Sequence, residues 1–229
     1  MKWGGFNPFT LSDFPGCVAA VAFSQGCNFN CAYCHNRSLI KKTIAGGDKS
    51  SGVSDNTIIA HLQRRRGQLN GLVITGGEPT CQPDLPAFAQ LVRDTGMKIK
   101  LDTNGSHPDM LLELLVHHLV DYVAMDIKAP WHKYQAVAGA KADADAIKRS
   151  IEILTQCSIP YEFRVTAVSP LLDAKDLLEI GAEIGAIGPV YLQKFQSPHF
   201  SLFQTMDTTP GLLQVSHALQ QQFESVYVR

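Results

Sequence analysis

Short apolar runs rich in branched residues recur along the chain and alternate with longer segments of helical periodicity. The apolar runs predict strands over Val18–Ser24, Gly71–Thr75, Lys98–Asp102, Tyr122–Ile127, Glu162–Val168 and Val190–Phe195. The segments between them predict helices near Ser54–Arg66, Asp84–Thr95, Pro108–Leu119, Asp143–Gln156 and Asp173–Ile187, with a last helix near Pro210–Phe223. The chain therefore alternates strands and helices.

Alternation of this kind is typical of an α/β fold, in which helices cover a parallel sheet. About six strand–helix units fit the chain, fewer than the eight of a closed barrel. We therefore expect a partial (β/α)6 barrel, with parallel strands inside and helices outside. The chemistry of such barrels collects at the carboxyl ends of the strands. We expect one domain over residues 1–229, with a mobile loop at about 45–52, where the sequence is polar and rich in glycine.

Composition narrows the class of protein. With 229 residues, of which 45% are hydrophobic and 18% charged, the chain can bury one sizeable core. The formal net charge of -1 implies no general attraction to nucleic acid or to a membrane surface, so we expect neither as a partner. The apolar run Cys17–Phe23 is too short to span a bilayer and does not resemble a signal peptide. A cytoplasmic location is expected.

Three of the six cysteines crowd into a C-x₃-C-x₂-C motif directly after the first predicted strand, within a loop at 26–36. Thiolates bind iron–sulfur clusters or zinc, and Cys27, Cys31 and Cys34 are candidate ligands. His35 could complete a structural zinc site, although adjacent residues rarely reach one tetrahedral ion without strain. A cluster with three protein ligands leaves one iron open, as catalytic zinc sites leave one position open. The isolated cysteines, Cys17, Cys81 and Cys157, are interpreted as small buried residues.

Polar residues follow the next three predicted strands. In ITGGEP, Gly76 and Gly77 can let the backbone approach a ligand, and Glu78 is an anion with no partner nearby in sequence; a plain solvated turn is the alternative. LDTNG closes the third strand, where Asp102 is either a site residue or a cap of the next element. In MDIK, Asp126 needs a partner, and Lys128 projects from the same strand face.

The cysteine motif, with an aromatic residue, Tyr33, before its last cysteine, resembles the signature of the radical S-adenosylmethionine (SAM) superfamily. The runs GGFNPFTLSDFPG, GCNFNCAYCHN, TGGEP, LDTNG and MDIK, in this order, resemble the glycyl-radical-enzyme activases. The similarity is greatest to the anaerobic ribonucleoside-triphosphate reductase activating proteins, and it runs from Gly4 to the terminal VYVR. Gln193 and Lys194 depart from the Leu-Pro-Phe-His pattern of the pyruvate formate-lyase activase.

This resemblance implies an anaerobic oxidoreductase with one [4Fe-4S] cluster, whose open iron binds the amino and carboxylate groups of SAM. One electron, expected from flavodoxin or ferredoxin, cleaves SAM to a 5'-deoxyadenosyl radical. The radical then removes hydrogen from a glycine of a partner glycyl-radical enzyme, with anaerobic ribonucleotide reductase as the expected partner. Arg37, Lys41 and Lys42 form either a docking patch for an acidic electron donor or a solvated charge cluster.

The resemblance also implies roles for single residues. Tyr33 would border the adenine, unless it is a surface aromatic packed on the loop. Gly76, Gly77 and Glu78 would receive the methionine ammonium, and Lys128 would contact the methionine carboxylate. Arg164 is either a second ligand of that carboxylate or a buried counter-ion in the barrel. The cofactor site would further include Asp102, Thr103, Asn104 and Asp126, of which Asp102, Thr103 and Asp126 could help to hold a monovalent cation.

Two other functions compete with the activase hypothesis. The first is a radical SAM enzyme for a small molecule, resembling 7-carboxy-7-deazaguanine synthase. The second is a non-catalytic iron–sulfur or zinc protein, which would not need the motifs at the strand ends. An incomplete barrel that a protein loop could enter, and the absence of an evident insertion for a small substrate, favour the activase.

Overall fold

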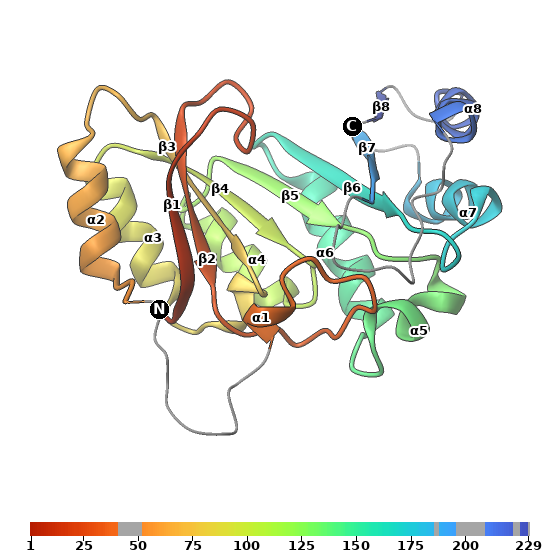
Figure 1. Cartoon of the computed structure of the whole chain (residues 1–229), viewed down its shortest axis with the longest axis horizontal. Coiled ribbons are helices and arrows are strands. Elements are labelled where there is room, and N and C mark those ends of the chain that lie inside the picture. The colour runs from red at the N-terminus through yellow and green to blue at the C-terminus, as the bar shows by residue number, and fades with distance from the viewer. Residues whose placement is uncertain (41–51, 186–187, 196–208, 222–224, 229) are drawn as a thin grey trace.

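The computed structural model of the chain describes residues 1–40, 52–185, 188–195, 209–221 and 225–228. These residues contain one eight-stranded sheet whose strands follow chain order from β1 to β8 (Figure 1). The first two strands are antiparallel, and every later pair of neighbours is parallel. The expected mobile loop at about 45–52 lies outside the described residues, apart from Gly52.

All six predicted strands are present, with ends shifted by no more than a few residues. They are β2 (Ala19–Ser24), β3 (Gly71–Gly76), β4 (Lys98–Thr103), β5 (Tyr122–Asp126), β6 (Tyr161–Ala167) and β7 (Val190–Lys194). They form the parallel part of the sheet. The apolar runs were a sound guide because strands of a covered parallel sheet are buried on both faces.

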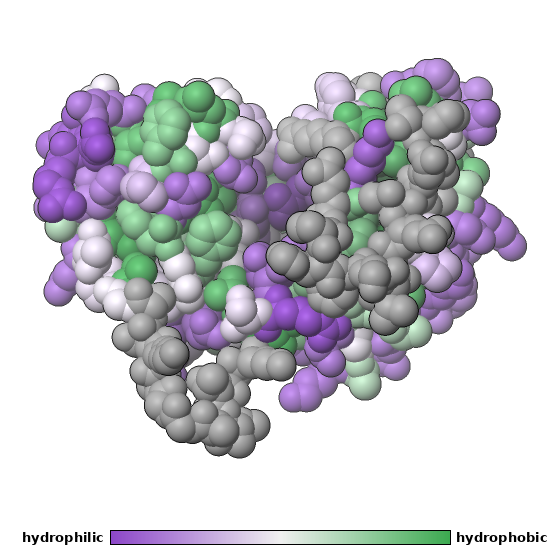
Figure 2. All heavy atoms as spheres, in the orientation of Figure 1, coloured by the Kyte–Doolittle hydropathy of each residue, from purple (hydrophilic) through white to green (hydrophobic). Residues whose placement is uncertain are grey.

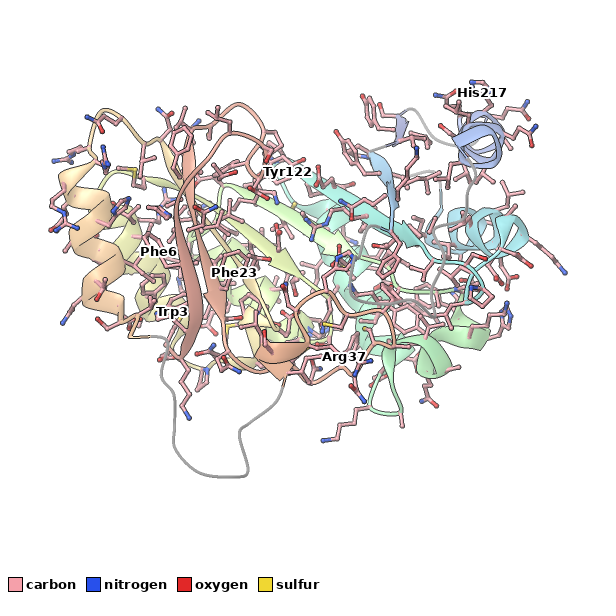
Figure 3. The ribbon with its side chains drawn as sticks, viewed as in Figure 1. Trp3, Phe6, Phe23, Arg37, Tyr122 and His217 are labelled. Carbon is pink, nitrogen blue, oxygen red and sulfur yellow. The ribbon has the colours of Figure 1, made fainter. Side chains whose placement is uncertain are left out.

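Two edge strands, β1 (Trp3–Thr10) and β8 (Val226–Val228), were not predicted. β1 has the sequence WGGFNPFT, and its pairing with β2 is irregular at two places, so it lacks regular alternation. Proline is tolerated there because an edge strand has one side without ladder bonds. Trp3 and Phe6 hold β1 to the first long helix: the Trp3 indole donates to Asp55 at 2.6 Å, and the Phe6 ring meets His61 edge-on (Figure 3).

The predicted helices are also present, as α2 (Asp55–Arg64), α3 (Leu85–Asp94), α4 (Pro108–Val116), α6 (Ala144–Gln156), α7 (Ala174–Ile184) and α8 (Thr209–Leu219). Two short helices, α1 (Arg37–Ile40) and α5 (Tyr134–Ala138), and the 3₁₀ turns η1 (Pro79–Cys81) and η2 (Trp131–Lys133) were not predicted. Amphipathic spacing explains the long helices. In α6, for example, the buried residues Ile147, Ile151 and Leu154 recur at intervals of three and four.

The sheet is curved and open, because its edge strands β1 and β8 do not pair with each other within the described residues. The helices cover its outer face from α2 at one end to α8 at the other (Figure 1). A small apolar cluster that includes Phe14, Val21 and Val73 fills the amino end of the inner face. The structure therefore confirms a partial barrel with helices outside. None of the described helices has the length and apolar character needed to cross a membrane.

Candidate active site

A cavity of about 390 Å³ opens at the carboxyl ends of the parallel strands. Its volume lies within the usual range of small-molecule sites. Its walls include all of the residues predicted for the cluster and the cofactor: Cys27, Cys31, Tyr33, Cys34, Gly76, Gly77, Glu78, Asp102, Thr103, Asn104, Asp126, Lys128 and Arg164. On the face shown in Figure 2, the surface is hollowed between the two ends of the sheet, and hydrophilic residues lie in the hollow.

The cysteine loop is held in place by two features that the sequence did not indicate. Two carbonyls at the end of α5 accept hydrogen bonds from backbone amides of the cysteine loop. Asn30 N donates to Ala138 O at 2.9 Å, and Ala32 N donates to Val137 O at 3.4 Å. From α1, the Arg37 guanidinium donates to the carbonyls of Cys31 and Ala32 at 3.2 and 2.9 Å. Arg37 therefore supports the loop (Figure 3). In the basic patch expected of Arg37, Lys41 and Lys42, Arg37 is thus not a freely solvated charge. Lys41 and Lys42 lie outside the described residues.

The three thiols of the motif line one cavity but are spread around it. Among the described residues, they do not form a set of three ligand atoms that all lie within 4.8 Å of one another. Ligands of a single tetrahedral zinc, with Zn–S distances of about 2.3 Å, would lie roughly 3.8 Å apart. His35, the candidate fourth ligand, stacks on Phe195 with ring centroids 4.8 Å apart. The donor set fits three irons of a cubane cluster better than one zinc ion.

Burial sets the protonation state of these thiols in the metal-free chain. It raises the pKa of Cys27 to about 12, and it also raises the pKa of Cys31. Both thiols therefore keep their protons at neutral pH until a metal displaces them. The isolated cysteines, which were expected to be small buried residues, are partly buried. Of these, Cys81 lies against the cysteine loop, where the backbone amide of Asn28 hydrogen-bonds its sulfur.

Gly76 and Gly77 bring the end of β3 onto the cysteine loop. Gly76 has φ of +114°, and a Cβ on Gly77 would lie 1.9 Å from the carbonyl oxygen of Gly26. The backbone amide of Gly77 donates to Ser24 O at 2.9 Å, and that of Glu78 donates to Gly26 O at 2.8 Å. The glycines line the cavity as predicted, but the close approach that requires them is to the backbone after β2.

Glu78 is a buried carboxylate, 1% exposed, with partners from two loops. Its Oε1 accepts from Thr80 N at 3.1 Å, Thr80 Oγ1 at 2.5 Å and Thr103 Oγ1 at 2.7 Å, and its Oε2 accepts from Asn104 N at 2.7 Å. Burial raises the pKa of Glu78, and these donors oppose the rise. The expectation that Glu78 has no partner nearby in sequence is wrong, because Thr80 donates to it twice. Through Thr103 and Asn104, Glu78 also joins the ends of β3 and β4.

Asn104 continues this connection to the cysteine loop. Its side-chain amide donates to Asn28 Oδ1 at 3.1 Å and lies 3.9 Å from Cys27 Sγ. The backbone amide of Phe29 also donates to Cys27 Sγ, at 3.4 Å. The ends of β3 and β4 and the cysteine loop therefore form one hydrogen-bonded unit around Cys27.

Five charged side chains alternate in sign across β4, β6 and the carboxyl end of β5. Lys100 bonds Asp102 Oδ1, and Arg164 Nη1 donates to Asp102 Oδ2 at 3.1 Å. Arg164 Nε donates to Asp126 Oδ1 at 2.7 Å, and Lys128 Nζ donates to Asp126 Oδ2 at 2.9 Å. Although burial opposes it, Arg164 and Lys128 hold the pKa of Asp126 well below its usual value. We name these five side chains the charged row; its net charge is +1.

The charged row bears on three residues that the sequence singled out. Asp126 pairs with Lys128 as predicted. Arg164 is a counter-ion in the barrel, here for two carboxylates, and it also lines the cavity. Asp102 bonds the charged row, so its carboxylate takes barrel partners instead of serving only as a cap. Lys100 was not predicted as a member of the site, although its partner Asp102 lies two residues on along the same strand.

Tyr33 is buried, with 4% exposed, and its ring meets Phe195 edge-on. The alternative of a surface aromatic is therefore wrong. Burial raises the pKa of Tyr33, and no hydrogen bond partner for its hydroxyl lies within the described residues. The cavity walls also include residues that were not predicted for the cluster or the cofactor: Phe29, His35, Asn36, Ile40, Thr75, Thr166, Gln193 and Lys194. For Gln193 and Lys194, the departure from the activase pattern was the signal available.

Comparison with known proteins agrees with this geometry. Residues 21–180 match the family described as the Radical SAM superfamily. The chain is 31% identical, over 84% of its length and 79% of the relative, to a Methanocaldococcus jannaschii protein named as an inferred glycyl-radical enzyme activating enzyme. It is 28% identical to the pyruvate formate-lyase-activating enzyme of Clostridium pasteurianum, over 72% of this chain and 68% of that protein.

Among solved structures, a radical SAM methyltransferase from Sphaerobacter thermophilus superposes with a TM-score of 0.76 and 12% identity. The match covers 96% of this chain and 68% of the other. At this identity, the likeness is one of fold.

Proposed function

The chain belongs to the radical SAM superfamily and is an enzyme of the glycyl-radical-enzyme activating type, and we propose that the protein it activates is an anaerobic ribonucleoside-triphosphate reductase. One observation carries the proposal at the level of chemistry. The three cysteines of the motif share one cavity with the cationic charged row. The choice of partner is supported by the order of motifs from Gly4 to the terminal VYVR. A cytoplasmic location is part of the proposal.

The chain's own residues would hold the cofactors as follows. Cys27, Cys31 and Cys34 would lose their protons and ligate the cluster. Lys128, at the cavity end of the charged row, would donate to the methionine carboxylate. Backbone oxygens near Gly76 and Gly77 would accept from the methionine ammonium. Once bound, the cluster and SAM would supply a 5'-deoxyadenosyl radical that takes hydrogen from a glycine of the partner.

Tyr33 and Phe195 would close the cavity on the side of the cysteine loop. Tyr33 is buried and meets Phe195 edge-on, and Phe195 in turn stacks on His35. Rings packed in this way would border the adenine and keep water from the reacting carbon. The hydroxyl of Tyr33 would be available to a polar atom of the cofactor. An acidic flavodoxin or ferredoxin is the proposed electron donor.

A glycine as the hydrogen donor has a physical rationale. Its Cα radical is delocalised over the flanking amide groups, so its Cα–H bond is weaker than those that a primary adenosyl radical can break. The glycine must come within van der Waals distance of the 5'-carbon, which requires a loop of the partner to enter this cavity. The open sheet, with β1 and β8 as separate edges, supports such entry.

The experiment follows the hydrogen atom. The partner reductase is produced with deuterated glycine and mixed anaerobically with reconstituted enzyme, dithionite and SAM, and 5'-deoxyadenosine is analysed by mass spectrometry. We expect product carrying one deuterium, and no deuterium transfer from a partner in which the reactive glycine is alanine. Unlabelled 5'-deoxyadenosine would favour the small-molecule enzyme. A complete lack of cleavage would favour the non-catalytic protein.

A further inference from the structure

The charged row bears on the monovalent cation that the resemblance implied. Asp102 and Asp126, together with Thr103, were expected to help ligate such an ion beside the methionine carboxylate. In the structure, these two carboxylates lie on adjacent strands and face the same cavity, as that role requires. Between them, however, lies the guanidinium of Arg164, which is 14% exposed.

Each of the four carboxylate oxygens already has a cationic partner. On Asp102, Oδ1 bonds Lys100 and Oδ2 accepts from Arg164 Nη1 at 3.1 Å. On Asp126, Oδ1 accepts from Arg164 Nε at 2.7 Å and Oδ2 accepts from Lys128 at 2.9 Å. Each oxygen therefore has one cationic N–H donor. A metal ion needs several oxygen ligands at once, so here it would have to share these oxygens with the cationic donors or displace them.

The net charge of the site also disfavours a cation. Three cationic and two anionic side chains already make the charged row positive by one unit. Another cation would add repulsion in a partly buried site, where charges are screened less than in water. A carboxylate ligand is favoured by the same excess charge. The residues present therefore do not fit a monovalent cation.

We propose that the guanidinium of Arg164 takes the place of the monovalent cation, so that SAM binding in this enzyme needs no added alkali ion. Arg164 is then a positioning residue, because it fixes the two carboxylates, and Asp126 in turn holds Lys128 toward the cavity. A planar guanidinium suits this place, since it presents several N–H donors in a fixed geometry and cannot lose its charge at neutral pH. The inference rests on the proposed function, because it concerns SAM binding at that site.

The test measures SAM affinity calorimetrically with the anaerobically reconstituted enzyme at constant ionic strength. Potassium, sodium and tetramethylammonium chlorides are compared. We expect wild-type affinities equal within about twofold in the three salts. Arg164→Ala frees Asp102 Oδ2 and Asp126 Oδ1, and should lose about tenfold or more in tetramethylammonium. Potassium, sodium or millimolar guanidinium should restore part of that loss, which a merely structural defect would not show.

Two variants keep the test decisive. Arg149→Ala, which removes an exposed arginine paired with Asp109, should match wild type in every salt. Arg164→Lys keeps a charge at the place, so its affinity should fall without becoming dependent on the salt. If Arg164→Ala does not fold, the wild-type comparison and Arg164→Lys still decide.

The outcomes separate this inference from the proposed function. A wild-type affinity at least tenfold weaker in tetramethylammonium than in potassium or sodium would overturn the inference and leave the proposed function standing. An affinity of Arg164→Ala equal to that of the wild type in all salts would also overturn the inference and leave the proposed function standing. Failure of the wild-type enzyme to bind SAM in any salt would instead contradict the proposed function.

Discussion

Replacing Glu78 with glutamine tests whether this side chain connects the ends of β3 and β4. The carboxylate accepts four hydrogen bonds, three at Oε1 and one at Oε2, and it is 1% exposed. Glutamine offers one oxygen and one NH₂ group. If its oxygen keeps the three bonds to Thr80 and Thr103, its NH₂ faces the backbone N–H of Asn104, and two buried donors oppose each other.

The magnitude follows from that mismatch. A buried donor left without an acceptor costs about 1–3 kcal/mol, and bonds to a charged acceptor are worth more than bonds to a neutral one. Part of the loss is offset because burial disfavours the charged form of Glu78, as its raised pKa shows. We therefore expect Glu78→Gln to lower the free energy of unfolding of the cluster-free chain by about 2 kcal/mol.

The assay is urea unfolding of the cluster-free chain at pH 7, followed by the fluorescence of its two tryptophans. Glu113→Gln is the matched control, because Glu113 is exposed on α4 and should change stability by less than about 0.5 kcal/mol. SAM affinity of the reconstituted variants is measured in parallel. Unchanged stability together with a tenfold loss of affinity would refute the reasoning, and would assign Glu78 the direct contact with the ammonium that the resemblance implied.

Three further predictions concern the cluster and the charged row. Alanine at any one of the three motif cysteines should abolish binding of about four irons and four sulfides, measured by iron and sulfide analysis; Cys157→Ala should bind the full amount, and its failure would contradict the ligand assignment. Lys128→Ala should weaken SAM binding about tenfold in calorimetry through loss of a charge-assisted bond, whereas exposed Lys148→Ala should not. Because the pKa of Asp126 is lowered in the folded state, the stability that Asp126 contributes is complete above about pH 4 and is lost as pH falls below it. Asp126→Asn should therefore flatten the pH dependence of the unfolding free energy below pH 4, and an unchanged slope would be evidence against the pairing.

The parallel strands and long helices were predictable because their signals are local. Each buried strand is an apolar run, and each long helix carries its apolar residues at intervals of three and four. Helix starts were visible as well: Ser54 caps α2 and Asp173 caps α7. β1 lacked such a signal, because its glycines, asparagine and proline are tolerated in an irregular edge strand.

Residues of the site were predictable as a set, but their contacts were not. The motifs end successive strands, so their meeting at one mouth follows from parallel topology. Which groups bond depends on strand register and side-chain reach. Thr103 and Asn104 meet Glu78 from 25 and 26 positions along the chain, and Arg164 reaches Asp102 across 62 positions. Lys100 is an exception, because it bonds Asp102 from two positions away on the same strand, a spacing visible in the sequence.

The support of the cysteine loop was missed for a related reason. α5 is five residues long, too short for periodicity to reveal it, and its role depends on two carbonyls at its end. Arg37 looked like a surface charge, yet its guanidinium caps two loop carbonyls. Backbone acceptors carry no sequence signature, so contacts of this kind emerge only from the fold.

The most direct test of the central claim is the radical on the partner protein. Reduced, reconstituted enzyme is mixed with SAM and the anaerobic ribonucleotide reductase of the same organism, and electron paramagnetic resonance spectra are recorded. The proposed function predicts a doublet from a glycyl radical, which disappears when the partner's reactive glycine is changed to alanine. Formation of 5'-deoxyadenosine without that doublet, with every glycyl-radical enzyme that the organism encodes, would contradict the claim.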